Sequence, residues 1–156
     1  MREEAEVLKE IRSALEGTGE RKAKFERVAA ILQEAGGYRW IGLYDVMENE
    51  IVLAAWSGAG PPAHRRFPVS QGLCGEAVRT RRPVVVGDVS KDPRYLKTLE
   101  STRSEIVVPI FDSVTGETRG LIDAESDRPD AFGEEDRDFL ERCAAELGTA
   151  VSPSPG

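Results

Sequence analysis

Cysteine and histidine are scarce in this chain of 156 residues, which has two cysteines, Cys74 and Cys143, and one histidine, His64. Two cysteines do not make the disulfide framework that stabilises many small secreted domains. A single histidine excludes a metal site built from several imidazoles, and the chain has no Cys-x-x-Cys pair. We therefore expect reduced thiols, no metal site and no cofactor.

Long apolar runs and positive charge are also missing. No apolar run approaches the roughly 20 residues of a membrane span, and residues 1–6 are too charged for a signal peptide. The net charge of −7 argues against nucleic acid or an anionic membrane as a partner. Neither phosphate-binding glycine motif, Gly-x-Gly-x-x-Gly or Gly-x-x-x-x-Gly-Lys-Ser/Thr, is present. We expect a cytoplasmic location.

Apolar residues at helical spacing predict helices near both ends of the chain. The helices are expected over residues 3–15, 22–34 and 72–80, and from about 133 to 151. The last of these begins with acidic residues, which the dipole of a helix favours in its first turn. The expected division is an N-terminal helix (1–18), one domain (19–151) and a disordered tail (152–156).

Segments rich in β-branched and aromatic residues predict a sheet. The expected strands are 38–47, 51–57, 83–87, 104–110 and 120–126. Short turns join the first two strands and the last two, which favours antiparallel pairing. The order of elements therefore predicts an α+β fold, a central antiparallel β-sheet with helices packed on it. The connection 88–103 is long, and one helical turn is expected near 93–99.

Acidic residues interrupt the last two predicted strands. Asp123 and Glu125 are two residues apart and so lie on one face of their strand, while Ile122 and Ala124 lie on the other. Glu105 lies at the start of the preceding strand. Three carboxylates on one face suit a cationic group, such as a ligand ammonium, or proton-transfer chemistry.

Cys74 stands between glycines in Gly72-Leu-Cys-Gly-Glu-Ala77, near the start of a predicted helix. Amide dipoles at a helix start lower the pKa of a thiol and favour the thiolate. Cys74 is therefore either a reactive thiol or a small buried residue that lets the helix approach the sheet. Cys143, on the apolar stripe of the last helix, is predicted to be core. A nucleophilic pair of Cys74 with His64 is permitted by the sequence but not suggested by it.

Trp40 and Tyr44 are four residues apart on the first predicted strand and share one of its faces. Two interpretations stay open. They are either ordinary core aromatics or the wall of a ligand pocket, since aromatic rings attract cations and thioethers.

Six segments, in order over about residues 20–150, resemble a GAF domain. They are Trp40-Ile-Gly-Leu-Tyr44, Gly72-Leu-Cys-Gly-Glu-Ala77, Gly87-Asp-Val89, Ser104-Glu-Ile-Val-Val-Pro109, Gly120-Leu-Ile-Asp123 and Phe132-Gly-Glu-Glu-Asp136. The second and fourth segments resemble, more narrowly, the single-domain free methionine-(R)-sulfoxide reductases. The resemblance implies N- and C-terminal helices on one face of the sheet, a ligand pocket on the other, and a homodimer formed through the N-terminal helices.

In the reductase branch, the pocket for the free amino acid is lined by residues that match Trp40, Tyr44, Glu105, Asp123 and Glu125. The chain departs from that branch at its thiols. At the position of Thr98 the branch has its catalytic cysteine, and at the position of His64 it has another cysteine. Cys74 remains, at a position that resembles a resolving thiol. Position 125 is also glutamate where the branch has aspartate.

Three functions stay open. The first is a sensor or regulatory GAF domain that binds a small molecule, such as free methionine sulfoxide or another amino acid. The second is a one-cysteine reductase of free methionine-(R)-sulfoxide, in which Cys74 attacks the sulfur. The third is a structural dimerisation module. Because position 98 has no thiol, the sequence favours binding over catalysis, with Cys74 as the one catalytic candidate.

Overall fold

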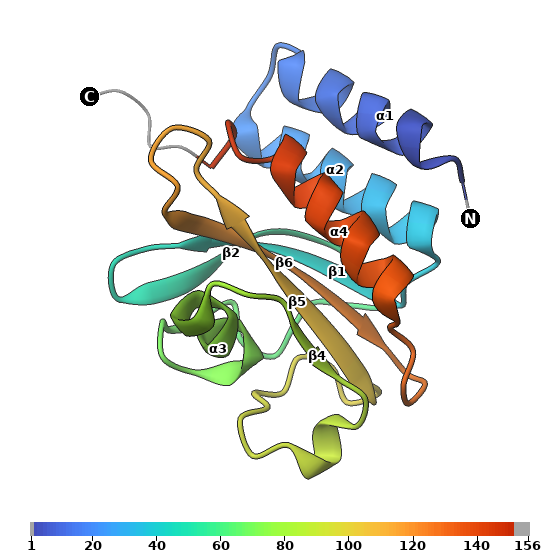
Figure 1. The fold of residues 1–156 in the computed structure, drawn as a ribbon, viewed down its shortest axis with the longest axis vertical. Coiled ribbons are helices and arrows are strands. Elements are labelled where there is room, and N and C mark those ends of the chain that lie inside the picture. Colours follow the sequence, from blue (N-terminus) through green and yellow to red (C-terminus); the bar gives the residue numbers. More distant parts are fainter. Residues whose placement is uncertain (1, 152–156) are drawn as a thin grey trace.

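The computed structural model describes residues 2–151 as a central sheet and its covering helices (Figure 1). The strands are β1 (Trp40–Val46), β2 (Glu50–Gly58), β3 (Arg66–Pro68), β4 (Val84–Val86), β5 (Ser104–Phe111) and β6 (Thr118–Ser126). The helices are α1 (Glu4–Glu16), α2 (Arg21–Gly36), α3 (Gly72–Thr80) and α4 (Glu134–Glu146), with a short 3₁₀ helix, η1 (Val89–Lys91). The six strands lie in the order β3-β2-β1-β6-β5-β4, and every neighbouring pair is antiparallel.

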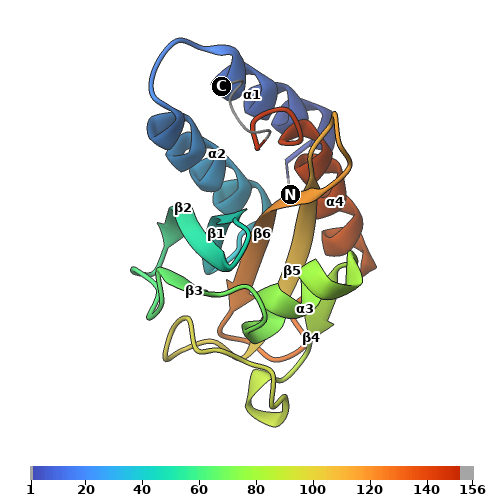
Figure 2. The same ribbon diagram turned by 90° about the vertical axis from the view of Figure 1, so that its left-hand side faces the viewer.

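Helices α1, α2 and α4 lie on one side of the sheet, and α3 lies on the other (Figures 1 and 2). The period of two along β1 explains both layers. Ile41 and Leu43 pack with the three helices, whereas Trp40 and Tyr44 belong to a second apolar cluster with residues of α3. Strands β5 and β6 alternate in the same way. This arrangement confirms the predicted α+β fold.

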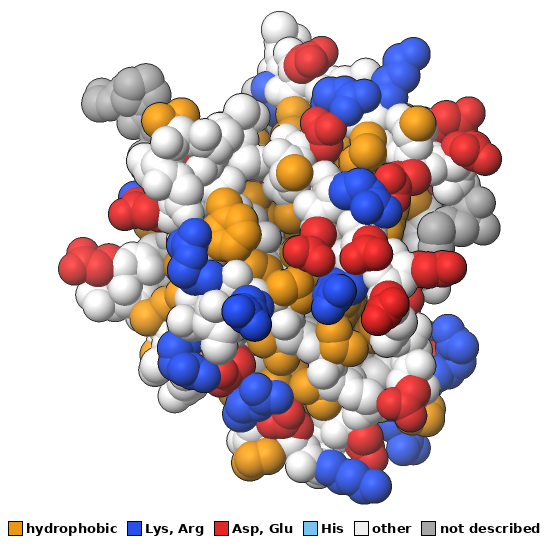
Figure 3. All heavy atoms as spheres, viewed as in Figure 1, with side chains coloured by type: hydrophobic (Ala, Val, Ile, Leu, Met, Phe, Trp, Pro, Cys, Tyr) orange, Lys and Arg blue, Asp and Glu red, His pale blue; other side chains and the backbone are white. Residues whose placement is uncertain are grey.

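The apolar residues of α1 are directed into the molecule. Val7 and Ile11 are fully buried where α1 contacts α2 and α4. The outer surface is charged: Arg142 of α4 donates to Glu4, and Arg12 donates to Glu146. Figure 3 shows acidic and basic side chains interspersed over α1 and α4. Within residues 2–151, no helix combines the length and the apolarity that crossing a membrane requires.

Three details of the sequence prediction were wrong. Strand β3 was not predicted, because three residues are too few to show a period. The helical turn expected at 93–99 lies instead at η1, where the Asp88 carboxylate accepts a hydrogen bond from Ser90 N–H at 3.0 Å and caps the turn. The last helix ends at Glu146 rather than near 151, although Val151 is buried as its stripe predicted. The predicted tail, 152–156, lies outside the described residues.

Gly42 lets two aromatic side chains fold over the middle of β1. A Cβ at this position would overlap the six-membered ring of Trp40 and lie 2.9 Å from Tyr44 Cε2. We expect Gly42→Ala to lower the free energy of unfolding by about 1–3 kcal/mol, as overpacking does. Urea unfolding measures this change. Gly17→Ala is the matched control, since its nearest atom would be 3.8 Å away; equal stability losses in both variants would contradict the packing argument.

Candidate functional site

The register of the sheet brings the three predicted acids together. Glu125 of β6 is paired with Trp40 of β1 on one side and with Glu105 of β5 on the other. Asp123 follows in the next row, opposite Gly42. Residues paired directly across antiparallel strands share a face, with Cβ atoms about 5 Å apart. The three carboxyl groups, here called the acid trio (Glu105, Asp123 and Glu125), therefore form one cluster on the α3 face.

The acid trio is almost completely out of solvent. The exposed fractions are 3% for Glu105, 1% for Asp123 and 0% for Glu125. Thr102 Oγ1 donates to Glu125 Oε1 at 2.8 Å. One oxygen of each acid, however, has no other hydrogen-bond partner in the described chain. Buried carboxylate oxygens without donors are destabilising unless they hold a proton or meet a cation.

Burial and mutual repulsion determine the protonation of the trio. Burial raises the pKa of Glu105 well above its usual range, and the charge of Glu125 raises it further. The pKa of Asp123 is raised by burial and then by Glu105, and that of Glu125 by burial and then by Asp123. Because each carboxylate disfavours ionisation of the next, all three groups favour the protonated form more strongly than an acid in solvent does.

The two predicted aromatics have different positions. Tyr44 lines a small cavity together with Asp123, and its ring meets Phe67 edge-on at 5.8 Å. Trp40 is fully buried above Gly42 and donates its indole N–H to the Gly60 carbonyl at 2.8 Å. Tyr44 is thus placed as a pocket wall, while Trp40 lies in the adjoining core. A direct contact of either ring with a ligand stays a prediction.

Cys74 lies near the start of α3 and faces the acid trio. The sequence left two interpretations open, a thiol whose pKa is lowered by the amide dipoles of the helix start and a small buried residue. Cys74 is buried, and burial raises its pKa well above its usual range, with the charges of Asp123 and Glu105 adding to the effect. In the ligand-free state Cys74 is a protonated thiol. Cys143 is fully buried among the α4 core residues, as predicted.

The cavity lined by Glu105 and Asp123 is small. Its volume is ≈ 10 Å³, about the space that holds one water molecule. Two segments outside the regular elements cover it, 59–65 through His64 and 92–103 through Leu96, Lys97 and Thr98. A hydrogen bond of 2.9 Å from Ala63 N–H to the Thr98 carbonyl ties these segments together. His64 and Cys74 thus line one cavity, which the sequence permitted but did not suggest.

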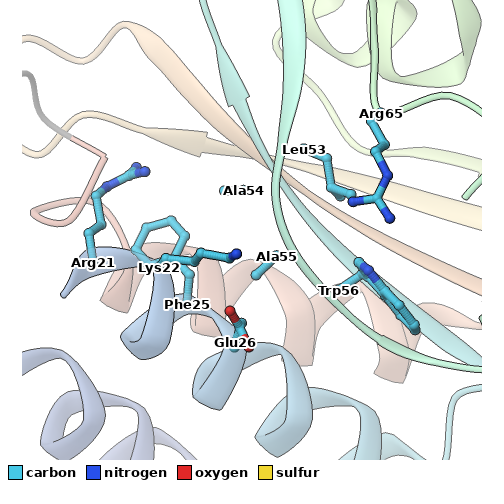
Figure 4. A pocket seen from close by; sticks show the side chains of 9 residues that line it. All are labelled: Arg21, Lys22, Phe25, Glu26, Leu53, Ala54, Ala55, Trp56 and Arg65. Atoms are coloured by element: carbon cyan, nitrogen blue, oxygen red, sulfur yellow. The ribbon is translucent and has the colours of Figure 1, made fainter. Parts of the chain in front are cut away.

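A larger hollow of ≈ 590 Å³ lies elsewhere, between α2 and β2 (Figure 4). Its lining carries the cationic side chains of Arg21, Lys22 and Arg65 around an apolar floor that includes Phe25. Arg21 is already engaged, since it donates to both carboxylate oxygens of Asp45. This hollow holds none of the predicted site residues.

Comparison with known proteins identifies the family. The GAF domain model matches residues 20–151, so the chain belongs to the GAF domain family.

Relatives in this family include reductases. The chain is 34% identical over 135 residues to "GAF domain-containing protein A" of Dictyostelium discoideum, covering 86% of this chain and 83% of the relative. It is 35% identical over 108 residues to the free methionine-R-sulfoxide reductase of Saccharomyces cerevisiae, covering 67% of this chain and 58% of the relative. The free methionine-R-sulfoxide reductase of Neisseria meningitidis, solved with its substrate, superimposes with a TM-score of 0.83 at 35% identity, covering 95% and 87% of the two chains. These similarities confirm the predicted kinship with the reductases.

Proposed function

We propose that this protein is a small-molecule-binding GAF domain whose pocket accepts an amino-acid-like ligand, in a sensor or regulatory role. The ligand's ammonium group lies against Glu105, Asp123 and Glu125. One observation carries the proposal: Glu105 and Asp123 line one cavity with Glu125 paired beside Glu105, all three are buried, and no Lys or Arg within residues 2–151 forms an ion pair with them.

An ammonium group matches the trio in charge and in hydrogen bonding. It brings three N–H donors, and the trio offers one oxygen without another partner on each acid. Charge-assisted hydrogen bonds of this kind are about twice as strong as neutral ones. The cation also removes the repulsion that keeps protons on the acids. The ligand's side chain extends toward Tyr44 and Phe67, which adjoin Asp123 along the cavity wall.

Binding an amino acid requires the cover to move, because a cavity of ≈ 10 Å³ does not hold one. The cover segments 59–65 and 92–103 contain no strand or α-helix in the described structure, so they can shift without breaking the sheet. The hydrogen bond between Ala63 and Thr98 has to open with them. The acids themselves stay fixed on β5 and β6. Relatives crystallised with their substrate support the view that this fold admits a ligand.

Calorimetry with four matched ligands tests the proposal. These are the (R) and (S) sulfoxides of L-methionine, L-methionine itself and N-acetyl-L-methionine, which lacks the ammonium group. We expect at least one free amino acid to bind and to stabilise the protein by about 2.7 kcal/mol at 100 times its Kd. The N-acetyl compound and the Glu125→Gln variant should show no binding. Equal affinity for the acetylated ligand would overturn the ammonium assignment.

A second candidate is thiol-dependent reduction of free methionine-(R)-sulfoxide by Cys74. It is favoured by one observation: the Cys74 sulfur lies within 4.8 Å of carboxylate oxygens of Glu105 and Asp123. The thiolate would attack the sulfoxide sulfur and take its oxygen as a sulfenic acid, releasing methionine. An external thiol would then form a mixed disulfide and release water. Consumption of the (R) sulfoxide that Cys74→Ser abolishes would establish this activity, and binding without consumption would leave the sensor function.

A homodimer and a cytoplasmic location stay predictions. Because the apolar residues of α1 are buried against α2 and α4, a second copy would have to meet the charged outer faces of these helices. Such an interface would be salt-sensitive. If the protein is instead a structural dimerisation module, light scattering should detect a dimer, and calorimetry should detect no binding of the four ligands.

A further inference from the structure

A thiol and two carboxyl groups converge from three elements of the fold. Cys74 lies on α3, Glu105 on β5 and Asp123 on β6. One ligand atom from each, the sulfur and two carboxylate oxygens, lie within 4.8 Å of one another. Sequence reasoning missed this grouping, because it sought several histidines or a Cys-x-x-Cys pair and these residues are scattered along the chain.

Two further observations indicate that a small ligand fits between these atoms. Glu105 Oε1 and Asp123 Oδ1 are buried and have no hydrogen-bond partner among the described residues outside the cluster. Both side chains line the ≈ 10 Å³ cavity, as does Cys74. That volume accommodates a single atom-sized ligand and not an amino acid. The cavity is therefore lined by acids and is about the size of a single ion.

We propose that Cys74, Glu105 and Asp123 form a binding site for a divalent transition-metal ion of the zinc type. A thiolate ligand selects such an ion over Mg²⁺ or Ca²⁺, which prefer oxygen ligands alone. Zinc bonds of about 2.3 Å to sulfur and about 2.1 Å to oxygen place tetrahedral ligand atoms roughly 3.5 Å apart. The 4.8 Å limit of the present cluster thus needs side-chain shifts of about 1 Å. The ion would balance two of the negative charges gathered there.

Three protein ligands leave a fourth position for water or for His64, which lines the same cavity. Bound in this way, the ion would join α3 to the sheet and hold the closed conformation. It would also occupy the place of the ligand ammonium. The metal and the amino acid should therefore exclude each other, so that zinc acts as an inhibitor of the pocket.

Cobalt provides the test, because Co²⁺ can replace Zn²⁺ and its absorption spectrum reveals which ligands bind it. The full chain is treated with a chelator, kept reduced with a phosphine and titrated with Co²⁺. We expect one ion per chain and a near-ultraviolet thiolate-to-cobalt charge-transfer band, which Zn²⁺ removes. Cys74→Ser should abolish the band, and both Cys74→Ser and Asp123→Asn should weaken binding by at least about tenfold. Zn²⁺ should raise the apparent Kd of any amino acid that binds.

Two control variants separate this site from other possibilities. Cys143→Ala removes the thiol on α4 and should leave the cobalt spectrum unchanged. Glu125→Gln lies in the acid trio but outside the metal ligands, so it should keep the cobalt band while losing amino-acid binding. The metal site would be refuted by a band that survives in Cys74→Ser, or by the lack of a one-to-one complex in the folded wild type. Metal binding without any amino-acid binding would confirm the metal site and refute the ammonium assignment.

Discussion

Replacing Thr98 with cysteine is expected to give the protein thiol-dependent activity on free methionine-(R)-sulfoxide. The rate should rise at least about tenfold above that of the wild type, which corresponds to about 1.4 kcal/mol of activation free energy. Thr98 is 7% exposed and lines the same cavity as Cys74, Glu105 and Asp123. A thiol at this position would share the cavity with the bound sulfoxide and would have Cys74 as the second thiol.

The expected reaction balances with these groups, water and an external dithiol. The introduced thiolate attacks the sulfoxide sulfur, and the sulfoxide oxygen takes up a proton from water and passes to the cysteine sulfur. Methionine leaves and the cysteine becomes a sulfenic acid. Cys74 then attacks the sulfenic sulfur, releasing water and closing a disulfide that dithiothreitol reduces. A threonine hydroxyl does neither step, which is why the wild type is expected to bind rather than to reduce.

Methionine production, followed by chromatography, measures the gain. Thr98→Ser is the matched control, because it removes a methyl group without adding sulfur and should stay inactive. The double variant Thr98→Cys/Cys74→Ser should release methionine once per chain and then turn over slowly, for want of the second thiol. A folded Thr98→Cys variant that binds the sulfoxide but never consumes it would show that position 98 does not face the ligand's sulfur.

Removing one charge from the acid trio should stabilise the ligand-free protein and abolish ligand binding. In the chelator-treated protein at about pH 8, we expect Asp123→Asn to raise the free energy of unfolding by about 1–3 kcal/mol, since a buried group without partners is destabilising. The gain should depend on pH. Because burial raises the pKa of Asp123 in the folded state, the wild type has its full stability below the unfolded pKa and loses it as the pH rises through the folded pKa.

The variant has no titrating group at position 123. The difference between its free energy of unfolding and that of the wild type should therefore grow with pH, by at most about 1.4 kcal/mol per pH unit for each proton. Urea unfolding at several pH values measures the difference. Asp138→Asn provides the same change in net charge on a half-exposed side chain of α4 and should leave the pH dependence of the wild type unaltered. An Asp123→Asn variant that is less stable than the wild type at every pH would show that the Asp123 carboxyl group stabilises the folded protein.

The sequence predicted the middle of the sheet well because a period of two is a strong signal. Ile122 and Ala124 pack against the helices while Asp123 and Glu125 point to the other face, as alternation required. The sequence also predicted an acidic cluster that includes Glu105, and the register of the sheet pairs this residue with Glu125. Gly42 is a further signal in the sequence, because a glycine inside a strand often marks the close approach of another group, here two aromatic rings.

The parts that failed depend on contacts between distant segments. The cover of the cavity is fixed by a hydrogen bond between residues 63 and 98, which no local pattern encodes. The direction of the Cys74 pKa shift also depended on tertiary structure. The amide dipoles of α3 and a buried position for Cys74 could both be inferred from the sequence, but the nearby charges of Asp123 and Glu105 could not. Electrostatics at a buried site is decided by its neighbours in space.

The acid trio and the segments that cover the cavity belong to separate parts of this molecule. The acids stand on the two central strands, where a backbone shift would disturb both cores, while the cover is supplied by connecting segments. Evolution can lengthen, shorten or rewrite such segments without unfolding the domain. A lineage could therefore exchange the residue at position 64 or 98, and with it gain or lose a chemical reaction, while inheriting the same acidic floor. A few substitutions would then separate the ligand binding proposed for this protein from reduction of the same ligand.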